Sequence, residues 1–322
     1  MKIRTLTAVA LFAAGSAFQA ALAAPFPEKP VRIIVPFAPG GNVDIVNRIV
    51  AQAMGDELKQ SFIVENRAGA NGAIGTEYVA RSAPDGYTLV VAVTETMALN
   101  PSLRKTLPYE PLKDFTSIGI VDTFPFSLVL SAKVPANDVK SFVAYARERP
   151  GKLNFSSWGN GSLSQIAMEQ LKQLTGIDLL HVPFKGAAPA ITAVTAGTIE
   201  AFIAPLSLSV PYSADGRVKL IAVTSAERQP NVPNVPTLTE QGIPVVVTGW
   251  HVLAAPAGTP ADVIATLNRA LLVATARADV RDKLLKAGVL PAGSTPQEAQ
   301  ALVNAEFKRW GDVARKAGIA PE

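Results

Sequence analysis

Short apolar runs alternate with stretches of helical spacing along most of the chain. Residues 31–35 have the length and apolar content of a buried strand, and apolar residues then recur at helical spacing from Val43 to Met54. The same order of strand and helix returns at residues 153–174 and again at 179–197. Because strands that alternate with helices form parallel or mixed sheets with helices on their faces, this pattern predicts an α/β fold.

Further strands and helices follow from the same patterns. We expect strands at residues 61–66, 88–93, 115–120, 126–130, 199–204, 219–224 and 245–255. We expect helices at residues 76–81, at 139–148, around Val263 to Leu272, and around Phe307 and Trp310. Two stretches, 126–135 and 247–256, are extended and apolar and end in a Pro-containing turn before a helix. They are the expected crossovers between two α/β lobes.

The turn after the first strand has the composition of an anion site. Pro36 and Pro39 cannot donate to a sheet, so the strand should end there. Gly40 and Gly41 remove side chains where the chain turns, and Asp44 lies in the first turn of the next helix, where negative charge is favoured. A strand, a Gly-Gly turn and a helix N-terminus leave backbone N–H groups for an anion. A turn that binds nothing is an equal alternative on this stretch alone.

The same plan occurs again further along the chain. The strand at 153–157 opens into residues 158–164, with Gly161 in the turn, and then into a helix. Two such helix N-termini, one in each lobe, can face one ligand. The strand at 88–93 also ends in polar residues, and ligands of open α/β sheets lie beyond the carboxyl ends of strands. Thr94 and Thr96 are therefore candidate hydroxyl donors, with simple capping of the next turn as an equal alternative.

The N-terminus has the pattern of a secretory signal peptide. Lys2 and Arg4 precede a small, apolar run from residue 6 to residue 22, and Ala21-Leu22-Ala23 fits the small-residue rule before a cleavage point. We expect residues 1–23 to be removed and the mature chain to begin near Ala24 or Pro25. A membrane anchor fits less well, because the run is short and no stop-transfer segment follows.

Composition and charge exclude several classes of protein. The chain is 48% hydrophobic and 17% charged, as globular proteins are. Without Lys2 and Arg4 the 30 basic residues fall to 28, against 26 acids, which leaves a net charge of +2. This charge is too small to indicate nucleic acid or an anionic membrane surface as a partner. The chain has no cysteine, so no disulfide supports its core.

Residue patterns typical of catalysis are absent. His181 and His251 are the only histidines, each inside an apolar strand, where a histidine is more often a hydrogen-bonded core residue than a ligand or a base. No metal-ligand spacing, nucleophile elbow or Gly-Lys-Ser/Thr phosphate loop occurs. Gly159-Asn-Gly161 begins like a dinucleotide fingerprint, but Ser164 stands where the third glycine belongs. We therefore expect a binding protein that uses neither a metal nor a cofactor.

Seven short motifs occur in order over nearly the whole mature chain and carry a family resemblance. They are Pro36-Phe-Ala-Pro-Gly-Gly-Asn-Val-Asp44, Val64-Glu-Asn-Arg-Ala-Gly69, Pro84-Asp-Gly-Tyr87, Asn100-Pro101, Gly159-Asn-Gly-Ser162, His181-Val-Pro-Phe-Lys-Gly186 and Ala255-Pro-Ala-Gly-Thr-Pro260. Together they resemble the Bug family, the periplasmic solute-binding receptors of tripartite tricarboxylate transporters. The resemblance implies a two-lobed Venus-flytrap protein of type II-like architecture, in which crossover strands join two α/β domains.

The resemblance also implies a site. One carboxylate of a small organic acid is held by residues 37–44 and by their counterpart at 158–164 in the other lobe. Lys185 adds a charge in one interpretation and is a solvated lysine in the other. Two residues depart from the family pattern: Val43 stands where Thr or Ser is usual, and Gln165 where His is usual. The expected ligand-binding residues are Phe37, Ala38, Gly40, Gly41, Asn42, Asp44, Thr94, Thr96, Trp158, Gly161, Ser162, Ser164, Lys185 and Pro205.

The expected organisation and partners complete this interpretation. Residues 24–126 and 248–322 form lobe 1, and residues 127–247 form lobe 2. The expected ligand is a monocarboxylate with a less polar remainder, aromatic acids included, or a small dicarboxylate. The expected protein partners are the membrane subunits of a transporter, and the receptor itself is expected to be a monomer that binds no nucleic acid. The alternatives are a receptor for a signalling membrane protein and, less favoured, an exported hydrolase or isomerase that uses Asp44 or His181.

Overall fold

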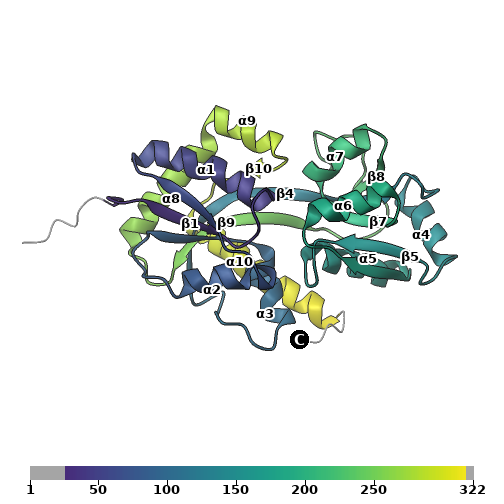
Figure 1. Cartoon of the computed structure of the whole chain (residues 1–322), viewed down its shortest axis with the longest axis horizontal. Helices are drawn as coiled ribbons and strands as arrows, with labels where there is room; N and C mark the ends of the chain where they lie inside the picture. Colours follow the sequence, from purple (N-terminus) through teal and green to yellow (C-terminus); the bar gives the residue numbers. More distant parts are fainter. Residues whose placement is uncertain (1–25, 317–322) are drawn as a thin grey trace, which may run out of the picture.

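The computed structural model describes residues 26–316. Figure 1 shows two α/β lobes side by side, joined by long strands that run between them. The expected signal peptide and its cleavage point lie outside the described residues. Within residues 26–316, no helix has both the length and the apolar character needed to span a bilayer.

Lobe 1 contains three parallel strands and one antiparallel strand that comes from much later in the chain. Its strands are β1 (Val31–Val35), β2 (Phe62–Asn66), β3 (Thr88–Ala92) and β9 (Thr248–Pro256). β1 lies between β2 and β3 and is parallel to both, whereas β9 is antiparallel to β3. Its helices are α1 (Asn42–Leu58), α2 (Ala73–Ala80), η2 (Glu95–Leu99), α3 (Asn100–Leu103), α8 (Ala261–Ala276), α9 (Ala278–Lys286) and α10 (Pro296–Lys316).

Lobe 2 repeats the plan with its own strands and helices. β5 (Leu153–Ser157) is parallel to β6 (Leu179–Pro183) and to β7 (Ala201–Pro205). β8 (Val218–Val223) is antiparallel to β4, the strand shared with lobe 1. Its helices are α4 (Val139–Arg147), α5 (Leu163–Thr175), α6 (Ala187–Ala196) and α7 (Leu206–Ala214). The mixed sheets confirm the expected α/β class.

One strand, β4 (Phe115–Ser131), belongs to both lobes. Its first part, Phe115 to Pro125, pairs with β9, and its second part, Phe126 to Ser131, pairs with β7 and β8. The prediction of two separate strands at 115–120 and 126–130 is therefore wrong, because these residues form a single strand of 17 residues. The polar residues between the two apolar runs, such as Asp122, remain extended and pair with β9.

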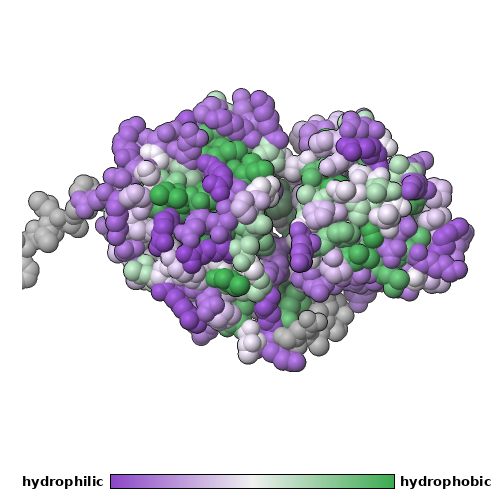
Figure 2. All heavy atoms as spheres, in the orientation of Figure 1, coloured by the Kyte–Doolittle hydropathy of each residue, from purple (hydrophilic) through white to green (hydrophobic). Residues whose placement is uncertain are grey.

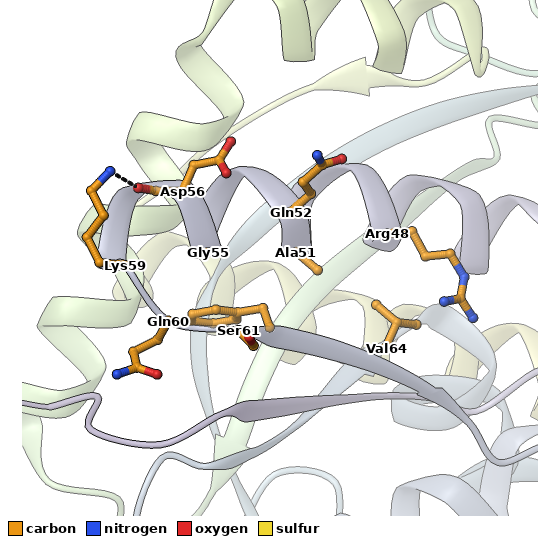
Figure 3. A pocket seen from close by; sticks show the side chains of 10 residues that line it. Arg48, Ala51, Gln52, Gly55, Asp56, Lys59, Gln60, Ser61 and Val64 are labelled. Carbon is orange, nitrogen blue, oxygen red and sulfur yellow. Dashed lines mark hydrogen bonds between the residues drawn. The ribbon is translucent and has the colours of Figure 1, made fainter.

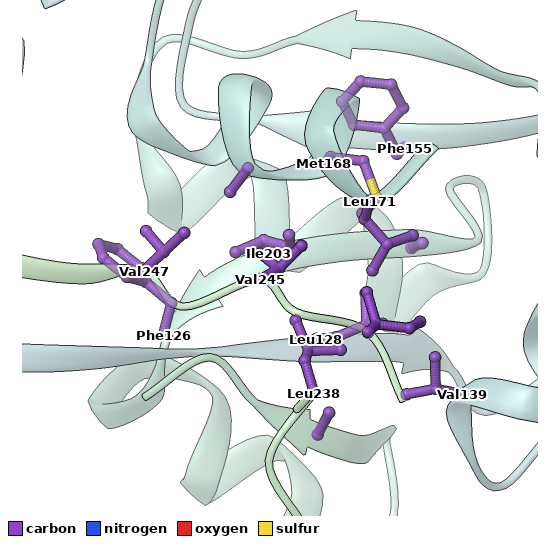
Figure 4. Packing of buried hydrophobic residues seen from close by; sticks show 14 of the residues in the cluster. Phe126, Leu128, Val139, Phe155, Met168, Leu171, Ile203, Leu238, Val245 and Val247 are labelled. Atoms are coloured by element: carbon purple, nitrogen blue, oxygen red, sulfur yellow. The ribbon is translucent and has the colours of Figure 1, made fainter. Parts of the chain in front are cut away.

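Each lobe has its own apolar core. In lobe 1, β1, β3 and β9 bury their side chains against α1 and α8. In lobe 2, Phe126 and Leu128 of β4 belong to one buried cluster with Phe155, Leu171 and the loop residue Val247, and Figure 4 shows Val247 beside Phe126. Three residues of lobe 1, Ala98, Leu99 and Trp310, also belong to this second core. The C-terminal helix α10 therefore fastens the two lobes together.

Several elements differ from the sequence-based expectation. Residues 94–100, expected as a loop, form the π-helical turn η2 and lead directly into α3. Helix α7 was missed because Pro211 lies inside it, and proline usually breaks a helix. Helix α9 and the short strand β10 (Leu290–Pro291), which pairs with β4, were also missed. Helix α2 begins at Ala73, earlier than expected, because the glycine-rich loop before it already turns into the helix.

Candidate functional site

The loop between β1 and α1 is held in shape by Asp44. This residue is only 4% exposed, and its carboxylate accepts hydrogen bonds from the Gly40 N–H at 3.0 Å, from Arg48 Nε at 3.0 Å and from Asn66 Nδ2 at 2.9 Å. Burial acts to raise the pKa of Asp44, but the hydrogen bonds from Arg48, Gly40 and Asn66 outweigh it and hold that pKa below its ordinary value. Asp44 thus positions the loop, and the Gly40 N–H is already engaged.

Other donors of the same loop have no partner within residues 26–316. The backbone N–H groups of Ala38 and Gly41 donate to no protein acceptor in the described part of the chain, and both residues are exposed. The side-chain amide nitrogen of Asn42 is buried and also lacks a partner among the described residues. Gly41 caps α1 without a side-chain bond, so the helix N-terminus is open. These groups can receive an anion.

The corresponding loop of lobe 2 uses most of its own donors. The Gly161 N–H donates to Gln165 Oε1 at 2.7 Å, and the Gln165 N–H donates to Ser162 Oγ at 3.4 Å, which caps α5. The Ser164 hydroxyl donates to the Ile203 carbonyl at 2.8 Å. Ser162 and Ser164 are fully buried. Their hydroxyl groups therefore hold the loop and α5 in place.

The loop of lobe 2 contacts lobe 1 beside the loop after β1. Asn71 Nδ2 of lobe 1 donates to the Gly161 carbonyl of lobe 2 at 3.3 Å and to Asn100 Oδ1 at 3.1 Å. A Cβ atom placed at Gly72 would lie 3.3 Å from the Phe37 ring, so the loop after β1 adjoins this contact. Figure 2 shows the seam at which the two lobes meet. The segment at Asn71 and Gly72 therefore touches the lobe 2 loop at Gly161 and adjoins the loop after β1 at Phe37.

Glu95 of lobe 1 reaches across this seam. Its Oε1 atom accepts hydrogen bonds from Trp158 Nε1 and from the Leu163 N–H, both at 3.3 Å. Glu95 is 7% exposed, and burial raises its pKa despite hydrogen bonds to Leu163 and Trp158 and the nearby His251. Glu95 was not among the expected residues. Its signal in the sequence was that it is the one charged residue between Asp85 and Arg104.

Trp158 forms the aromatic wall of lobe 2. Its ring stacks on Phe126 with the centroids 5.6 Å apart and meets Phe202 edge-on at 6.2 Å. The indole nitrogen is left to point toward Glu95, to which it donates. The body of Trp158 is thus fixed by packing, and its polar end lies at the cleft.

The other expected residues lie near the same edge. Thr96 exchanges hydrogen bonds with the backbone of Val93 at 3.2 Å, so its hydroxyl holds a turn, whereas the buried hydroxyl of Thr94 has no partner among the described residues. Lys185 is exposed, and it lies one residue before Gly186, whose N–H donates to the Trp158 carbonyl. Pro205 ends β7, where it pairs with Phe126.

Both histidines are engaged within their lobes. His181 Nε2 lies 2.7 Å from Ser157 Oγ, and the ring stacks on Phe155; burial lowers the pKa of His181. His251 is fully buried, with Nδ1 2.8 Å from Asp122 Oδ2. In the part of the chain that the structure describes, no group of His, Asp and Glu side chains could hold a metal ion.

A separate hollow of about 590 Å³ lies on lobe 1 between α1 and β2. Figure 3 shows Arg48, Gln52 and Asp56 of α1 and the C-cap residue Lys59 along it, with Val64 of β2 on the opposite side. Ile63 of the same edge strand is exposed. Arg48, at one end of this hollow, also binds Asp44 of the loop after β1, and long polar side chains line the rest of this surface groove.

Two α/β lobes that share β4 and meet along a seam define a two-lobed periplasmic binding protein. The comparisons with known proteins agree. The chain belongs to the TctC family, the tripartite tricarboxylate transporter family receptors, whose model matches residues 46–319. This confirms the resemblance on which the sequence analysis relied. Members of this family are solute-binding receptors of the periplasm and not enzymes, so the hydrolase alternative is set aside.

Relatives and solved structures match along nearly their whole length. Protein BugT of Bordetella pertussis is 32% identical over 318 residues, which cover 98% of each chain. Rpa4515 of R. palustris, solved with adipate, is 34% identical with a TM-score of 0.87 and covers 92% of this chain and 100% of its own. MatC of Rhodopseudomonas palustris, solved with malate, is 36% identical with a TM-score of 0.82, and the match covers 89% of this chain and 99% of that one.

Proposed function

We propose that this protein captures a small organic carboxylate between its lobes and delivers it to a tripartite tricarboxylate-type transporter in the membrane. The observation that carries the proposal is the loop after β1, where the N–H groups of Ala38 and Gly41 and the Asn42 amide are free of protein acceptors within residues 26–316. Rpa4515 with adipate and MatC with malate are related proteins that hold carboxylates, which supports the same class of ligand here.

The proposed mechanism is lobe closure around the ligand. A ligand whose carboxylate lies on the loop after β1 would be enclosed from lobe 2 by the loop that carries Trp158 and Gly161, which already touch lobe 1 through Glu95 and Asn71. We place lobe 1 at residues 24–126 and 248–322 and lobe 2 at residues 127–247, after removal of the signal peptide near Ala23. The receptor acts as a monomer, and delivery to a signalling membrane protein is the second candidate use of the same closure.

The test combines ligand discovery with a pair of matched variants. Native mass spectrometry of freshly purified protein identifies any ligand that co-purifies, and calorimetry with a panel of carboxylic acids measures affinity. Gly41→Pro removes one free N–H at a φ of −79°, which proline tolerates, whereas Gly41→Ala keeps the N–H and has no atom closer than 3.8 Å to its new Cβ.

We expect Gly41→Pro to weaken carboxylate binding about tenfold, since one hydrogen bond to a charged group is lost. Gly41→Ala should bind nearly as the native protein does. Tight binding of neutral sugars alone, or equal affinity of the two variants, would contradict the proposed site.

A further inference from the structure

Glu95 occupies the place at which lobe 2 would otherwise hold an anion. The N-terminus of α5 favours negative charge, and the carboxylate that lies there is the protein's own. Glu95 Oε1 accepts from the Leu163 N–H in the first turn of α5 and from Trp158 Nε1, both at 3.3 Å. A carboxylate from lobe 1 thus fills the anion position of lobe 2.

The remaining donors of that loop offer little to a second anion. The Gly161 N–H is engaged by Gln165, and the Gln165 N–H by Ser162. A ligand carboxylate placed here would find these donors taken and would lie beside the charge of Glu95. Like charges repel strongly in a partly buried site, so this end of the cleft disfavours a carboxylate.

Glu95 also lacks a full positive partner. No Lys or Arg forms an ion pair with it in the part of the chain that the structure describes, although it is only 7% exposed. His251 is the nearest potential cation, but its Nδ1 atom lies 2.8 Å from Asp122 Oδ2 and is engaged there. A buried carboxylate without a cation is costly, and a cation supplied by the ligand would relieve that cost.

A second acceptor, Thr94, directly precedes Glu95 in the chain. The hydroxyl of Thr94 is buried, with the residue 2% exposed, and it has no hydrogen-bond partner among residues 26–316. A hydroxyl oxygen can accept one N–H of an ammonium group while Glu95 accepts another. Glu95 and Thr94 thus offer two acceptor oxygens at the start of η2, as a donor with several protons requires.

We infer that Glu95 determines ligand specificity: together with Thr94 it binds the ammonium group of a ligand whose carboxylate is held by the loop after β1. The preferred solute is then an amino acid in the broad sense, with a single carboxylate at one end and an ammonium group at the other. This inference rests on the proposed function, because it assumes that the free N–H groups of lobe 1 bind a carboxylate.

The experiment compares probes that differ only at the end facing Glu95. Within each of three sets the spacer is constant, and the end group is an ammonium group, a carboxylate or a hydrogen atom. The sets are β-alanine, succinate and propionate; δ-aminovalerate, adipate and valerate; and p-(aminomethyl)benzoate, p-carboxyphenylacetate and p-toluate. Affinities are measured by calorimetry for the native protein and for Glu95→Gln, which keeps an oxygen acceptor for Trp158 and Leu163 but removes the charge. Glu57→Gln, on the exposed side of α1, is the matched control.

In at least one set, we expect the native protein to bind the ammonium probe about tenfold or more tightly than the dicarboxylate. Glu95→Gln should reduce that ratio by about tenfold, and Glu57→Gln should leave it unchanged. Thr94→Val, which keeps the shape of the side chain and removes the hydroxyl, should also reduce the affinity ratio of ammonium probe to dicarboxylate. It is the test variant if Glu95→Gln does not fold.

A native preference for the dicarboxylates, or a ratio that neither Glu95→Gln nor Thr94→Val changes, overturns this inference and leaves the proposed function intact. If no carboxylate of any set binds, the inference and the proposed function both fail.

Discussion

At the residue scale, two buried carboxylates have different roles: Asp44 positions a loop within lobe 1, and Glu95 lies at the contact between the lobes. Asp44 has its donors within lobe 1, and these hydrogen bonds lower its pKa against the effect of burial. Glu95 takes its donors from the other lobe, and burial prevails, so its pKa is raised. The same kind of side chain thus positions a loop at one place and joins the lobes at another.

The raised pKa of Glu95 predicts a pH dependence of stability. The folded state holds this proton more tightly than the unfolded state, so the contribution of Glu95 to stability is full below the ordinary value of 4.5 and is lost as pH rises through the folded pKa. Glu95→Gln removes that loss. We expect the variant to gain stability relative to the native protein at about pH 7.5 and to gain less at about pH 4.

Chemical unfolding of both proteins at the two pH values measures this difference. Glu57→Gln should show no such change with pH, because Glu57 is exposed on α1. A gain that is the same at both pH values would show that the proton of Glu95 is not bound more tightly in the folded state.

Single residues also show the limit of sequence-based prediction. The Gly-Gly turn at Gly40 and the capped start of α5 at Ser162 follow local rules of proline, glycine and helix capping, and they were predictable. Glu95 and Asn71 were not, because their partners lie 63 to 90 residues away, in the other lobe. Nothing in their local sequence specifies which loop they will face.

At the scale of elements, helix α5 begins at the contact between the lobes. Gly161 has a φ of +70°, and a Cβ placed on it would lie 3.1 Å from Leu103 Cδ1 of lobe 1. Gly176, at the other end of the same helix, has a φ of +67° with open space around it. The two glycines have the same backbone conformation but different surroundings.

We therefore predict different effects on binding for the same substitution. Gly161→Ala and Gly176→Ala should each lower stability by about 1 kcal/mol, because alanine is strained at positive φ. Only Gly161→Ala should also weaken ligand binding, since its methyl group presses on Leu103 as the lobes close. Thermal unfolding and calorimetry separate the two effects, and equal affinities for both variants would contradict the role given to this contact.

The pairing of β4 with β9 explains why residues 115–131 form one strand where the sequence predicted two. The apolar runs at 115–120 and 126–130 were separated by polar residues, and a strand break was the simplest interpretation. The structure keeps Asp122 extended, because His251 on the adjacent strand β9 provides a buried partner at 2.8 Å. A pairing between strands 129 residues apart thus overrides the local signal.

At the scale of the whole molecule, a second contact joins the lobes away from the two loops. Gly288, between α9 and β10, lies against Ser207 of α7, and a Cβ atom at Gly288 would overlap the side chain and backbone of Ser207. In Figure 1, α9 and α7 lie at the same end of the two lobes. A small residue at position 288 is therefore required for the present closeness of the lobes.

Gly288→Ala should hold the lobes further apart. We expect a larger radius of gyration by small-angle X-ray scattering and weaker ligand binding, because closure must overcome the overlap with Ser207. Gly216→Ala is the control, since Gly216 follows α7 with a φ of +69° and open space around it. An unchanged radius of gyration together with unchanged affinity would show that this contact does not limit closure.

The last helix has a consequence for how the chain is made. Trp310 of α10 completes the core of lobe 2, and β9, which begins at residue 248, completes the sheet of lobe 1. A nascent polypeptide therefore cannot finish either half until almost all of it has left the ribosome. Such a delay suits a secretory precursor, which must thread through a translocation channel before it becomes compact.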